Sequence, residues 1–369
     1  MMNIGPRNIM KTPVFAALGL IIFTLDFSSV FAESPYPPSN FITGVTWDWS
    51  TRDTLAPGSD NWPITWADDN NQYTCWGDGG GFGGTNSLGR VSLGFARVEG
   101  DWNNYQGKNI WGGYNSANPV RFGGKSYGII CINGVLFAWL GQDGSNSGSE
   151  KFVKQTMLIK SVDHGATWVK SNWFWTDNDN LYGPSFLNFG KNYTGARDDY
   201  VYSYFPRGST WMLHKPGMAD LARVPRNEIM SQKAYEWFAG FDDSGNPAWT
   251  SNLDARQPVF EDPNGVRTVS VCYNPGLKRY ILTSQHTKVG REPGTNQWGI
   301  FEAEEPWGPW QTVYYTTNWA GGIGNISFYF APKWFSADGR DFALIYTAND
   351  HWGAVRGHFT LKNSNNTQP

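Results

Sequence analysis

The sequence predicts an all-β fold, specifically a five-bladed β-propeller. Three observations favour this architecture. Apolar and polar residues alternate in short runs of about 5–8 residues between turn-forming clusters, as in half-buried strands. Helical periodicity is almost absent, and the chain carries 43 Gly and 21 Pro in 369 residues. A hairpin followed by a more aromatic outer pair of strands recurs about every 60 residues, and such a period is typical of propeller blades.

The composition excludes several other classes of protein. Aromatic residues make up 16% of the chain, far more than a disordered protein carries. A net charge of −3 provides no basic field for binding the phosphates of a nucleic acid. Three cysteines are too few for a disulfide framework, and we expect Cys75, Cys131 and Cys272 to be buried, reduced thiols with at most one disulfide.

The first 32 residues have the pattern of a secretory signal. The basic residues Arg7 and Lys11 precede an apolar run over 13–23, and cleavage is expected after Ala32. The apolar run is short for a membrane span, although an uncleaved anchor is the alternative. The mature protein, one propeller domain over 33–369, is therefore expected to be secreted or periplasmic, monomeric and free of the membrane.

Five units of four short strands are expected along the chain, and eleven segments are the examples that alternate most clearly. The strands lie at 62–66, 72–77, 126–132, 135–140, 156–161, 200–205, 268–273, 279–284, 298–302, 333–335 and 342–347, and the blades at roughly 50–110, 115–180, 182–250, 256–315 and 320–360. A strand at 42–49 would close the ring by joining the last blade. The best helical candidate is 227–238. A β-sandwich is the alternative, but it fits this period poorly.

The segment from Ser161 to Trp168 (SVDHGATW) matches the S-x-D-x-G-x-T-W "Asp box" of sialidase-like propellers. In that motif the Asp and Thr hold a turn between the outer strands of a blade, and the Trp packs beneath it. The motif supports the fold and carries no chemistry of its own.

Two aspartates flank the first hairpin and are our candidates for catalysis. If the turn is centred on Asp69, the residue numbers of antiparallel partners sum to about 138, and Asp60 faces Asp78. Two carboxylates this close would raise the pKa of one of them, as a general acid and base pair requires. The alternative is structural: Asp60 would cap a turn and Asp78 would anchor the Gly-rich loop.

This pattern, Asp60…Trp66…Gly77-Asp78-Gly, resembles the opening blade of proteins with domain of unknown function 4185. The segments 211–225, 273–280 and 306–310 resemble the same family, so that the resemblance covers most of the mature chain. The family is related to five-bladed propeller glycosidases, and some members are endo-D-arabinanases of glycoside hydrolase family 183. The resemblance implies that Asp60 and Asp78 are the catalytic carboxylates. The residues beside each Asp depart from the arabinanase pattern, which leaves the substrate open.

Other residues are expected at the channel because they recur at matching places in the units. The expected substrate-binding side chains are Trp62, Trp76, Arg121, Tyr204, Arg207, His214, Arg267, His286, Asn325 and His351. A ring of Arg, His, Tyr and Asp suits a polar sugar, especially an acidic one. The alternative for each is a solvated loop residue or, for the tryptophans, packing between blades.

Metal and cofactor signals are weak. The chain has no C-x-x-C, H-E-x-x-H or P-loop motif, and 79–84 lacks the Lys of a phosphate loop. Residues 177–180 (DNDN) match part of a calcium loop without its Gly and final Glu. We expect no catalytic metal and no cofactor, and a structural Ca²⁺ in the channel stays open.

The sequence therefore predicts a secreted glycoside hydrolase whose partner is a poly- or oligosaccharide. Two alternatives remain. A polysaccharide lyase could use Tyr204, with His214 or His286, and with Arg207 or Arg267 to neutralise a uronate. A non-catalytic glycan-binding propeller would use the same channel without cleavage.

Overall fold

The computed structural model describes residues 1, 34–143, 154–208, 216–286 and 296–362. The expected signal segment lies outside these residues. Within the described part of the chain, no helix has the length and apolarity needed to cross a membrane.

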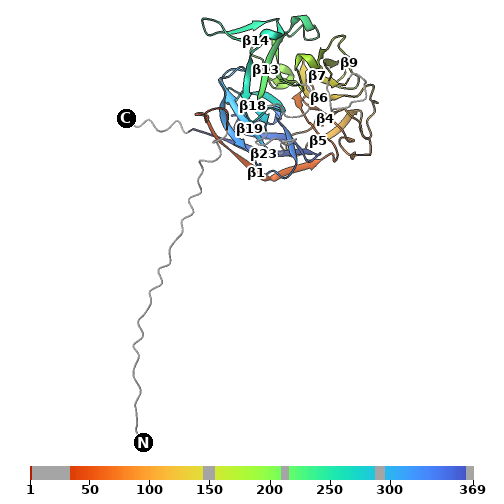
Figure 1. The fold of residues 1–369 in the computed structure, drawn as a ribbon. Helices are drawn as coiled ribbons and strands as arrows, with labels where there is room; N and C mark the ends of the chain where they lie inside the picture. The colour runs from red at the N-terminus through yellow and green to blue at the C-terminus, as the bar shows by residue number, and fades with distance from the viewer. Residues whose placement is uncertain (2–33, 144–153, 209–215, 287–295, 363–369) are drawn as a thin grey trace.

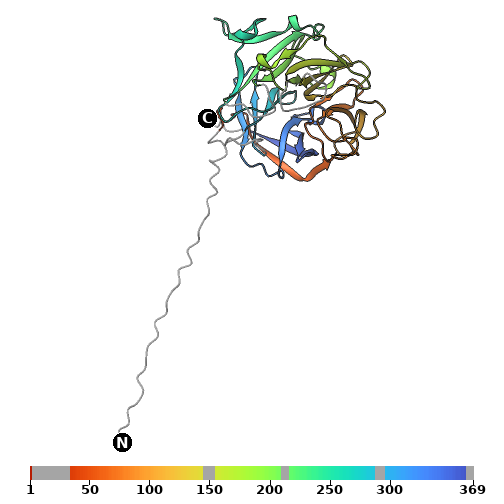
Figure 2. The same cartoon turned by 45° about the vertical axis from the view of Figure 1, so that its right-hand side comes forward.

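The strands form a five-bladed β-propeller whose blades follow one another in chain order (Figures 1 and 2). Strands within a blade pair antiparallel, and a parallel pairing of Leu187–Asn188 with Val271–Cys272 joins the third and fourth blades into one sheet. The first blade holds β2 (Ile64–Trp66), β3 (Gln72–Trp76), β4 (Gly94–Glu99) and β5 (Gln106–Trp111). The second holds β6 (Lys125–Ile132), β7 (Val135–Gln142), β8 (Gln155–Ser161), β9 (Val169–Lys170) and β10 (Trp175–Thr176). The third holds β11 (Ser185–Asn188), β12 (Tyr200–Pro206), β13 (Gly217–Pro225), β14 (Glu236–Phe241) and β15 (Pro247–Thr250), and β16 (Pro258–Asp262) pairs with β13. The fourth holds β17 (Val269–Asn274), β18 (Arg279–Gln285), β19 (Trp298–Ala303) and β20 (Gln311–Thr316). The fifth holds β21 (Asn325–Phe330), β22 (Asp341–Ala348) and β23 (Trp352–Leu361).

The ring is closed by the N-terminal strand β1 (Ile42–Leu55), which pairs antiparallel with β23. This confirms the prediction that a strand near 42–49 joins the last blade. The red β1 lies beside the blue C-terminal strands in Figure 1. Closure joins the two ends of the described chain and covers the edge that β23 would otherwise expose.

In the described residues the helical content consists of short 3₁₀ turns: η2 (Asp177–Asp179), η3 (Lys191–Tyr193), η4 (Gln232–Ala234), η5 (Leu253–Ala255) and η6 (Pro332–Trp334). The prediction of a helix over 227–238 is wrong. Isolated turns and η4 lead there into β14, and the buried Tyr235 donates its hydroxyl to the carbonyl of Ile229 at 2.8 Å. The strand expected at 333–335 is also wrong, because η6 occupies it and β21 precedes it.

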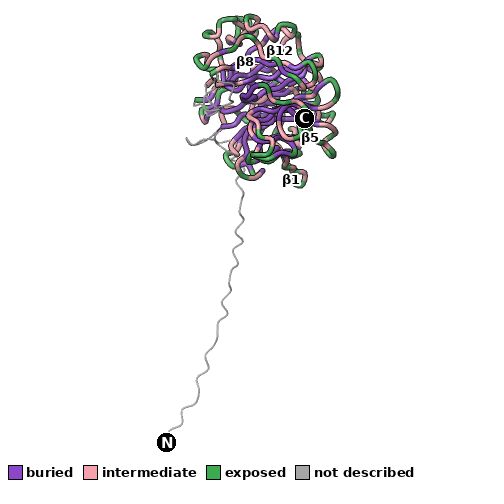
Figure 3. Tube along the Cα trace, turned by 90° about the vertical axis from the view of Figure 1, so that its right-hand side faces the viewer, coloured by how far each residue is buried: buried purple, intermediate pink, exposed green. Residues whose placement is uncertain are grey.

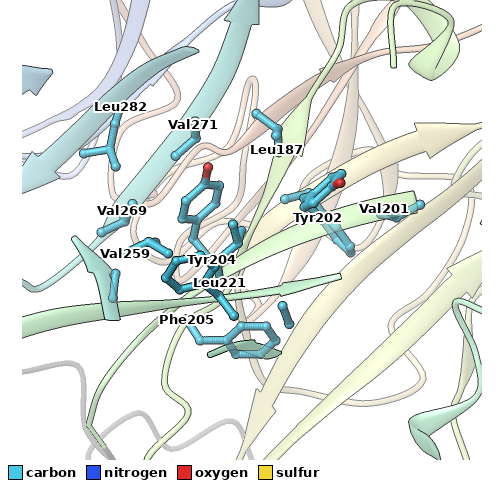
Figure 4. Close-up of a cluster of buried hydrophobic side chains, with 14 of the residues drawn as sticks. Leu187, Val201, Tyr202, Tyr204, Phe205, Leu221, Val259, Val269, Val271 and Leu282 are labelled. Carbon is cyan, nitrogen blue, oxygen red and sulfur yellow. The ribbon is translucent and has the colours of Figure 1, made fainter. Parts of the chain in front are cut away.

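The core lies between the blades. Large buried clusters join the fourth blade to the fifth and the fifth to the first, as Figure 3 shows by the purple interior. Another cluster extends from the second blade to the fourth and includes Tyr204, Leu221 and Val271 (Figure 4). The inner strand of a blade is therefore covered on both faces by neighbouring sheets. In β6, the inner strand of the second blade, all eight residues are buried.

The segment that matches the Asp box forms the turn between β8 and β9. Burial opposes ionisation of Asp163, but hydrogen bonds from Thr167 and Ser161 hold the pKa of its carboxyl below its usual value. Trp168 stacks on Phe95 of the first blade with ring centroids 4.0 Å apart. The turn therefore fastens the second blade to the first.

All three cysteines are free and buried, as predicted. Burial raises the pKa of the Cys75 and Cys131 thiols to about 12 and raises that of Cys272 further. We expect native protein to resist an aromatic disulfide reagent at pH 8, where a thiolate is the reactive form. The aromatic thiolate released from the reagent is measured by its absorbance. It should correspond to three reactive thiols per molecule only after the protein is unfolded in guanidinium. Rapid labelling of the native protein would contradict this prediction.

Candidate functional site

Polar side chains gather around the inner strands of the blades. We call this set the channel mouth: Asp60, Asn61, Asp78, Lys125, Ser126, Tyr127, Tyr182, Arg267, Gln285, Ser327 and Tyr329. Hydrogen bonds link some of its members across the blades. Tyr329 of the fifth blade donates to Asn61 Oδ1 at 3.0 Å, and Asn61 donates to the Ser126 carbonyl at 3.0 Å. These bonds join the fifth, first and second blades at the mouth.

Further hydrogen bonds join neighbouring members of the set. Tyr127 of the second blade shares a hydrogen bond with Tyr182, which precedes the third blade. In the fourth blade, Arg267 donates to Gln285 Oε1 at 2.9 Å, and that oxygen also accepts from the Ser327 amide of the fifth blade. Residues of all five inner strands, Tyr127 and Tyr329 among them, line a central cavity with room for about one water molecule. A sugar is therefore too large to pass through the channel.

The first hairpin places Asp60 and Asp78 at the mouth. The predicted register holds along β2 and β3, where Thr65 faces Tyr73 and Trp66 faces Gln72. It changes by one residue beyond β2, so that Asp60 pairs with Gly77 rather than with Asp78. The positive φ of Asn61 (65°) shifts the chain here, and Asp78 itself has left the strand with a φ of 55°.

Asp78 contacts two cationic side chains. Its Oδ1 lies 2.9 Å from the ammonium of Lys125 and 3.1 Å from the guanidinium of Arg90. The Lys125 side chain is 3% exposed and that of Arg90 is 44% exposed. Opposite charges this close favour the ionised form of a carboxylate.

Gly77 allows this close packing of charges. A Cβ at residue 77 would lie 2.8 Å from Asp60 Oδ1 and 3.2 Å from Lys125 Nζ. Any larger residue there would push the two side chains away. Because the Lys125 ammonium also contacts Asp78, one cation lies beside both candidate carboxylates.

Trp62 and Trp76, which we expected to face the ligand, are core residues with 0% exposure. Their rings stack 5.8 Å apart, and Trp62 also contacts Phe82 and Trp352. Large aromatic rings fill the wedge between the first and fifth blades, where neither ring can reach a sugar.

Tyr204 is also a core residue instead of a channel residue. It is 0% exposed and donates its hydroxyl to the Pro306 carbonyl at 2.6 Å (Figure 4). Arg207 directly follows β12, and its guanidinium donates to both oxygens of the fully buried Asp220 at 2.7–2.9 Å. Arg256 Nε donates to Asp220 Oδ2 at 2.7 Å. Asp220 therefore neutralises two arginines, and both bind within the fold.

The remaining expected residues are divided between the mouth and its surroundings. Arg267 belongs to the mouth. His286 directly follows Gln285, is 1% exposed and stacks on Tyr315 with centroids 4.0 Å apart. Asn325 is buried at the start of β21 and donates to Asn296 Oδ1 at 2.8 Å. His351 lies in the β22–β23 turn, Arg121 is exposed before β6, and His214 lies outside the described residues.

The tyrosines Tyr127 and Tyr182 were missed by the sequence analysis. Tyr127 lies within β6, and Tyr182 lies three residues before β11. Position along the strand is not a signal for the mouth, because Ser327 and Tyr329 also lie within a strand, β21.

Among the residues that the structure describes, one group of side chains could hold a metal ion. Ligand atoms of Asp68, Asp69 and His164 lie within 4.8 Å of one another, at the turn of the first hairpin, which is the end away from Asp60. His164 and Asp68 already contact each other at 2.9 Å. In the partial calcium-loop match, the Asp179 carboxylate instead accepts from the Thr176 amide at 2.7 Å.

Fold and site together define a five-bladed β-propeller with a charged, hydrogen-bonded channel mouth. The chain belongs to the family described as "Domain of unknown function (DUF4185)", whose model matches residues 145–355. This confirms the resemblance found in the sequence. The match begins after Asp60 and Asp78, so it does not include them. No curated protein matches the chain.

Solved structures resemble the chain over most of its length. A putative hydrolase from Bacteroides ovatus has a TM-score of 0.51 at 13% identity, covering 88% of this chain and 93% of that one. A GH43_1 enzyme from Xanthomonas citri has a TM-score of 0.46 at 11% identity, covering 91% and 97%. An alpha-L-arabinofuranosidase from Podospora anserina, solved with cellotriose, has 0.45 at 10% identity, covering 82% and 91%. At such identities the likeness concerns the fold.

Proposed function

We propose that the protein is a glycoside hydrolase that acts on a polysaccharide at the channel mouth. Two observations carry this proposal: the buried Lys125 ammonium lies 2.9 Å from Asp78 Oδ1, and a Cβ on Gly77 would lie within 3.2 Å of both that ammonium and Asp60 Oδ1. Hydrolysis of a glycosidic bond requires two carboxyl groups with different proton affinities. The sequence resemblance to family 183 hydrolases supports the same pair.

The reaction assigns one role to each carboxyl group. One protonates the oxygen of the leaving sugar, while the other, ionised, either activates water or attacks the anomeric carbon. Water supplies the hydroxyl group that ends on the new reducing sugar.

A lyase is the second candidate, and one observation favours it. Tyr127 and Tyr182 share a hydrogen bond at the mouth, and both Tyr127 and Arg267 interact electrostatically with Tyr329. A phenolate could remove a proton next to a uronate carboxylate that Arg267 neutralises, with loss of the linked sugar and formation of a double bond. The lyase hypothesis therefore moves from Tyr204 to this pair. A glycan-binding propeller without catalysis is the third candidate.

A panel of polysaccharides tests these functions. Neutral and acidic glycans, including D-arabinan, are incubated with the wild type and with the Asp60→Asn/Asp78→Asn double variant. We expect new reducing ends from the wild type alone, without ultraviolet absorbance at the wavelength of an unsaturated uronate. Absorbing products would support the lyase, and glycan binding without products by either protein would support the binding module.

The setting of the reaction follows from the sequence. Since residues 1–32 have the pattern of a signal peptide, we place the enzyme outside the cytoplasm, as a secreted or periplasmic monomer. The proposed chemistry uses carboxyl groups alone and requires no cofactor.

A further inference from the structure

Two hollows adjoin between the outer strands of the fifth blade and the β4–β5 loop of the first blade, and we call them together the outer groove. The first has a volume of about 330 Å³, and its lining includes Asp48, Asp341, Arg356 and His358. The second has a volume of about 290 Å³, and its lining includes Asp53, Trp102, Asn104 and Tyr105. Each hollow has the size of a site for a small ligand, and neither includes a residue of the channel mouth.

Arg356 joins the two hollows. Its guanidinium lies over the Trp102 ring, 5.6 Å from the ring centroid, and its backbone amide donates to Thr51 Oγ1 at 3.0 Å. Arg356 lines the first hollow, whereas Trp102 and Thr51 line the second. A ligand built of several linked units can therefore occupy both hollows at once.

Strand pairing explains why polar side chains gather in the first hollow. Asp48 of β1 pairs with Arg356 of β23, and His358 of β23 pairs with Asp341 of β22. Directly opposed residues of antiparallel strands point to the same face of the sheet. The Asp341 carboxylate lies 2.7 Å from the His358 ring. Three neighbouring strands therefore present charged side chains on the face that looks toward Trp102.

The lining combines the two kinds of surface that a sugar contacts. The rings of Trp102 and Tyr105 are partly exposed and offer apolar surface to the C–H groups of a sugar ring. A carboxylate has about four acceptor positions, so Asp53 can accept from a sugar hydroxyl as well as from the Tyr105 hydroxyl at 2.6 Å. Among the described residues that line the hollows, none is aliphatic, whereas the core of a protein interface is largely apolar.

The charge of the outer groove favours a neutral sugar. Three aspartates and one arginine line it, which gives the lining a net charge of −2 when its histidine is neutral. At its border, Lys333 and Asp101 lie 3.4 Å apart and compensate each other. A negatively charged lining repels a uronate or a phosphate, and it accepts hydrogen bonds from hydroxyl groups.

We propose that the outer groove is a second sugar-binding site, which holds a neutral oligosaccharide or a segment of a neutral polysaccharide. The choice of a polysaccharide as the source of this sugar rests on the proposed function. A chain bound in the groove stays close to the enzyme, so that its other segments meet the channel mouth at a raised effective concentration.

Affinity electrophoresis with the Asp60→Asn/Asp78→Asn double variant tests the inference without cleavage. Native gels contain neutral D-arabinan or xylan, or acidic polygalacturonate, and we expect a neutral polysaccharide to retard the protein. In the same background, Trp102→Ala and Asp48→Ala should each weaken that binding by about tenfold, as truncation of a central contact does. Trp49→Ala is the matched control, because Trp49 is a 37% exposed indole of β1 outside both hollows, and its binding should stay unchanged.

Three results would overturn the proposal: binding that Trp102→Ala and Asp48→Ala leave unchanged, retardation by polygalacturonate alone, and retardation by none of the polysaccharides. If Trp102→Ala does not fold, Asp48→Ala decides, because Asp48 is an exposed residue. The test separates this inference from the proposed function. Binding that depends on the groove, without cleavage by the wild type, contradicts the proposed function alone, whereas cleavage without such binding contradicts the groove alone.

Discussion

Asp78→Asn is expected to lower kcat/KM on the cleaved glycan by about 10²–10⁴-fold, the range that a general base or acid contributes. Asparagine keeps the size of the side chain, and it removes the negative charge that Lys125 and Arg90 contact. The variant can therefore neither accept the proton of water nor attack the sugar. Initial rates are measured by reducing ends on folded, monodisperse protein.

The control separates the loss of a catalytic carboxylate from the change in net charge. Asp243→Asn removes one exposed carboxylate in the turn between β14 and β15, the outer strands of the third blade. We expect its rate to stay within about twofold of the wild-type rate. Asp60→Asn should lower the rate as strongly as Asp78→Asn. Cleavage requires both carboxyl groups, because one protonates the leaving oxygen and the other activates water or attacks the sugar. If both Asp60→Asn and Asp78→Asn cleave at the wild-type rate, the pair has no catalytic role.

The ring itself was readable from the sequence because turn chemistry is local. The Asp69-centred turn sets the pairing of β2 with β3, and the hairpin at 133–134 sets that of β6 with β7. The change of register at Asp60 was not readable. It arises where Asn61 adopts a positive φ. The alternation of apolar and polar residues does not predict the backbone conformation of one residue.

The channel mouth was only partly readable, for a physical reason. Alternation reveals which side of a strand faces water, but the inner strands of a propeller are covered on both sides. Tyr204 and Tyr127 therefore look alike in sequence, although one packs between blades and the other borders the mouth. The partner of each hydroxyl separates them: Tyr204 donates to the Pro306 carbonyl, whereas Tyr127 is bonded to Tyr182.

The same reasoning corrects the role of the tryptophans and leads to a stability prediction. Trp62→Ala is expected to lower the free energy of unfolding by about 3–5 kcal/mol, as for other buried aromatic side chains. The Trp62 ring is fully buried between the first and fifth blades, against Trp76 and Trp352. Its removal leaves a cavity that the rigid neighbouring rings cannot fill. Urea unfolding followed by fluorescence measures the change.

Phe241→Ala is the matched control, because Phe241 is an aromatic residue that is 57% exposed at the end of β14. Its loss should change stability by about 1 kcal/mol or less, since little surface leaves or enters water. Glycan affinity per folded molecule should stay unchanged in Trp62→Ala, because a ring inside the wedge between blades cannot stack on a sugar. If Trp62→Ala keeps the wild-type stability but binds the glycan more weakly, the prediction is wrong and Trp62 contacts the ligand. If the expected result is obtained, tryptophan is abundant in this chain because its rings pack between the blades. Recognition of the sugar then depends on the polar residues at the mouth.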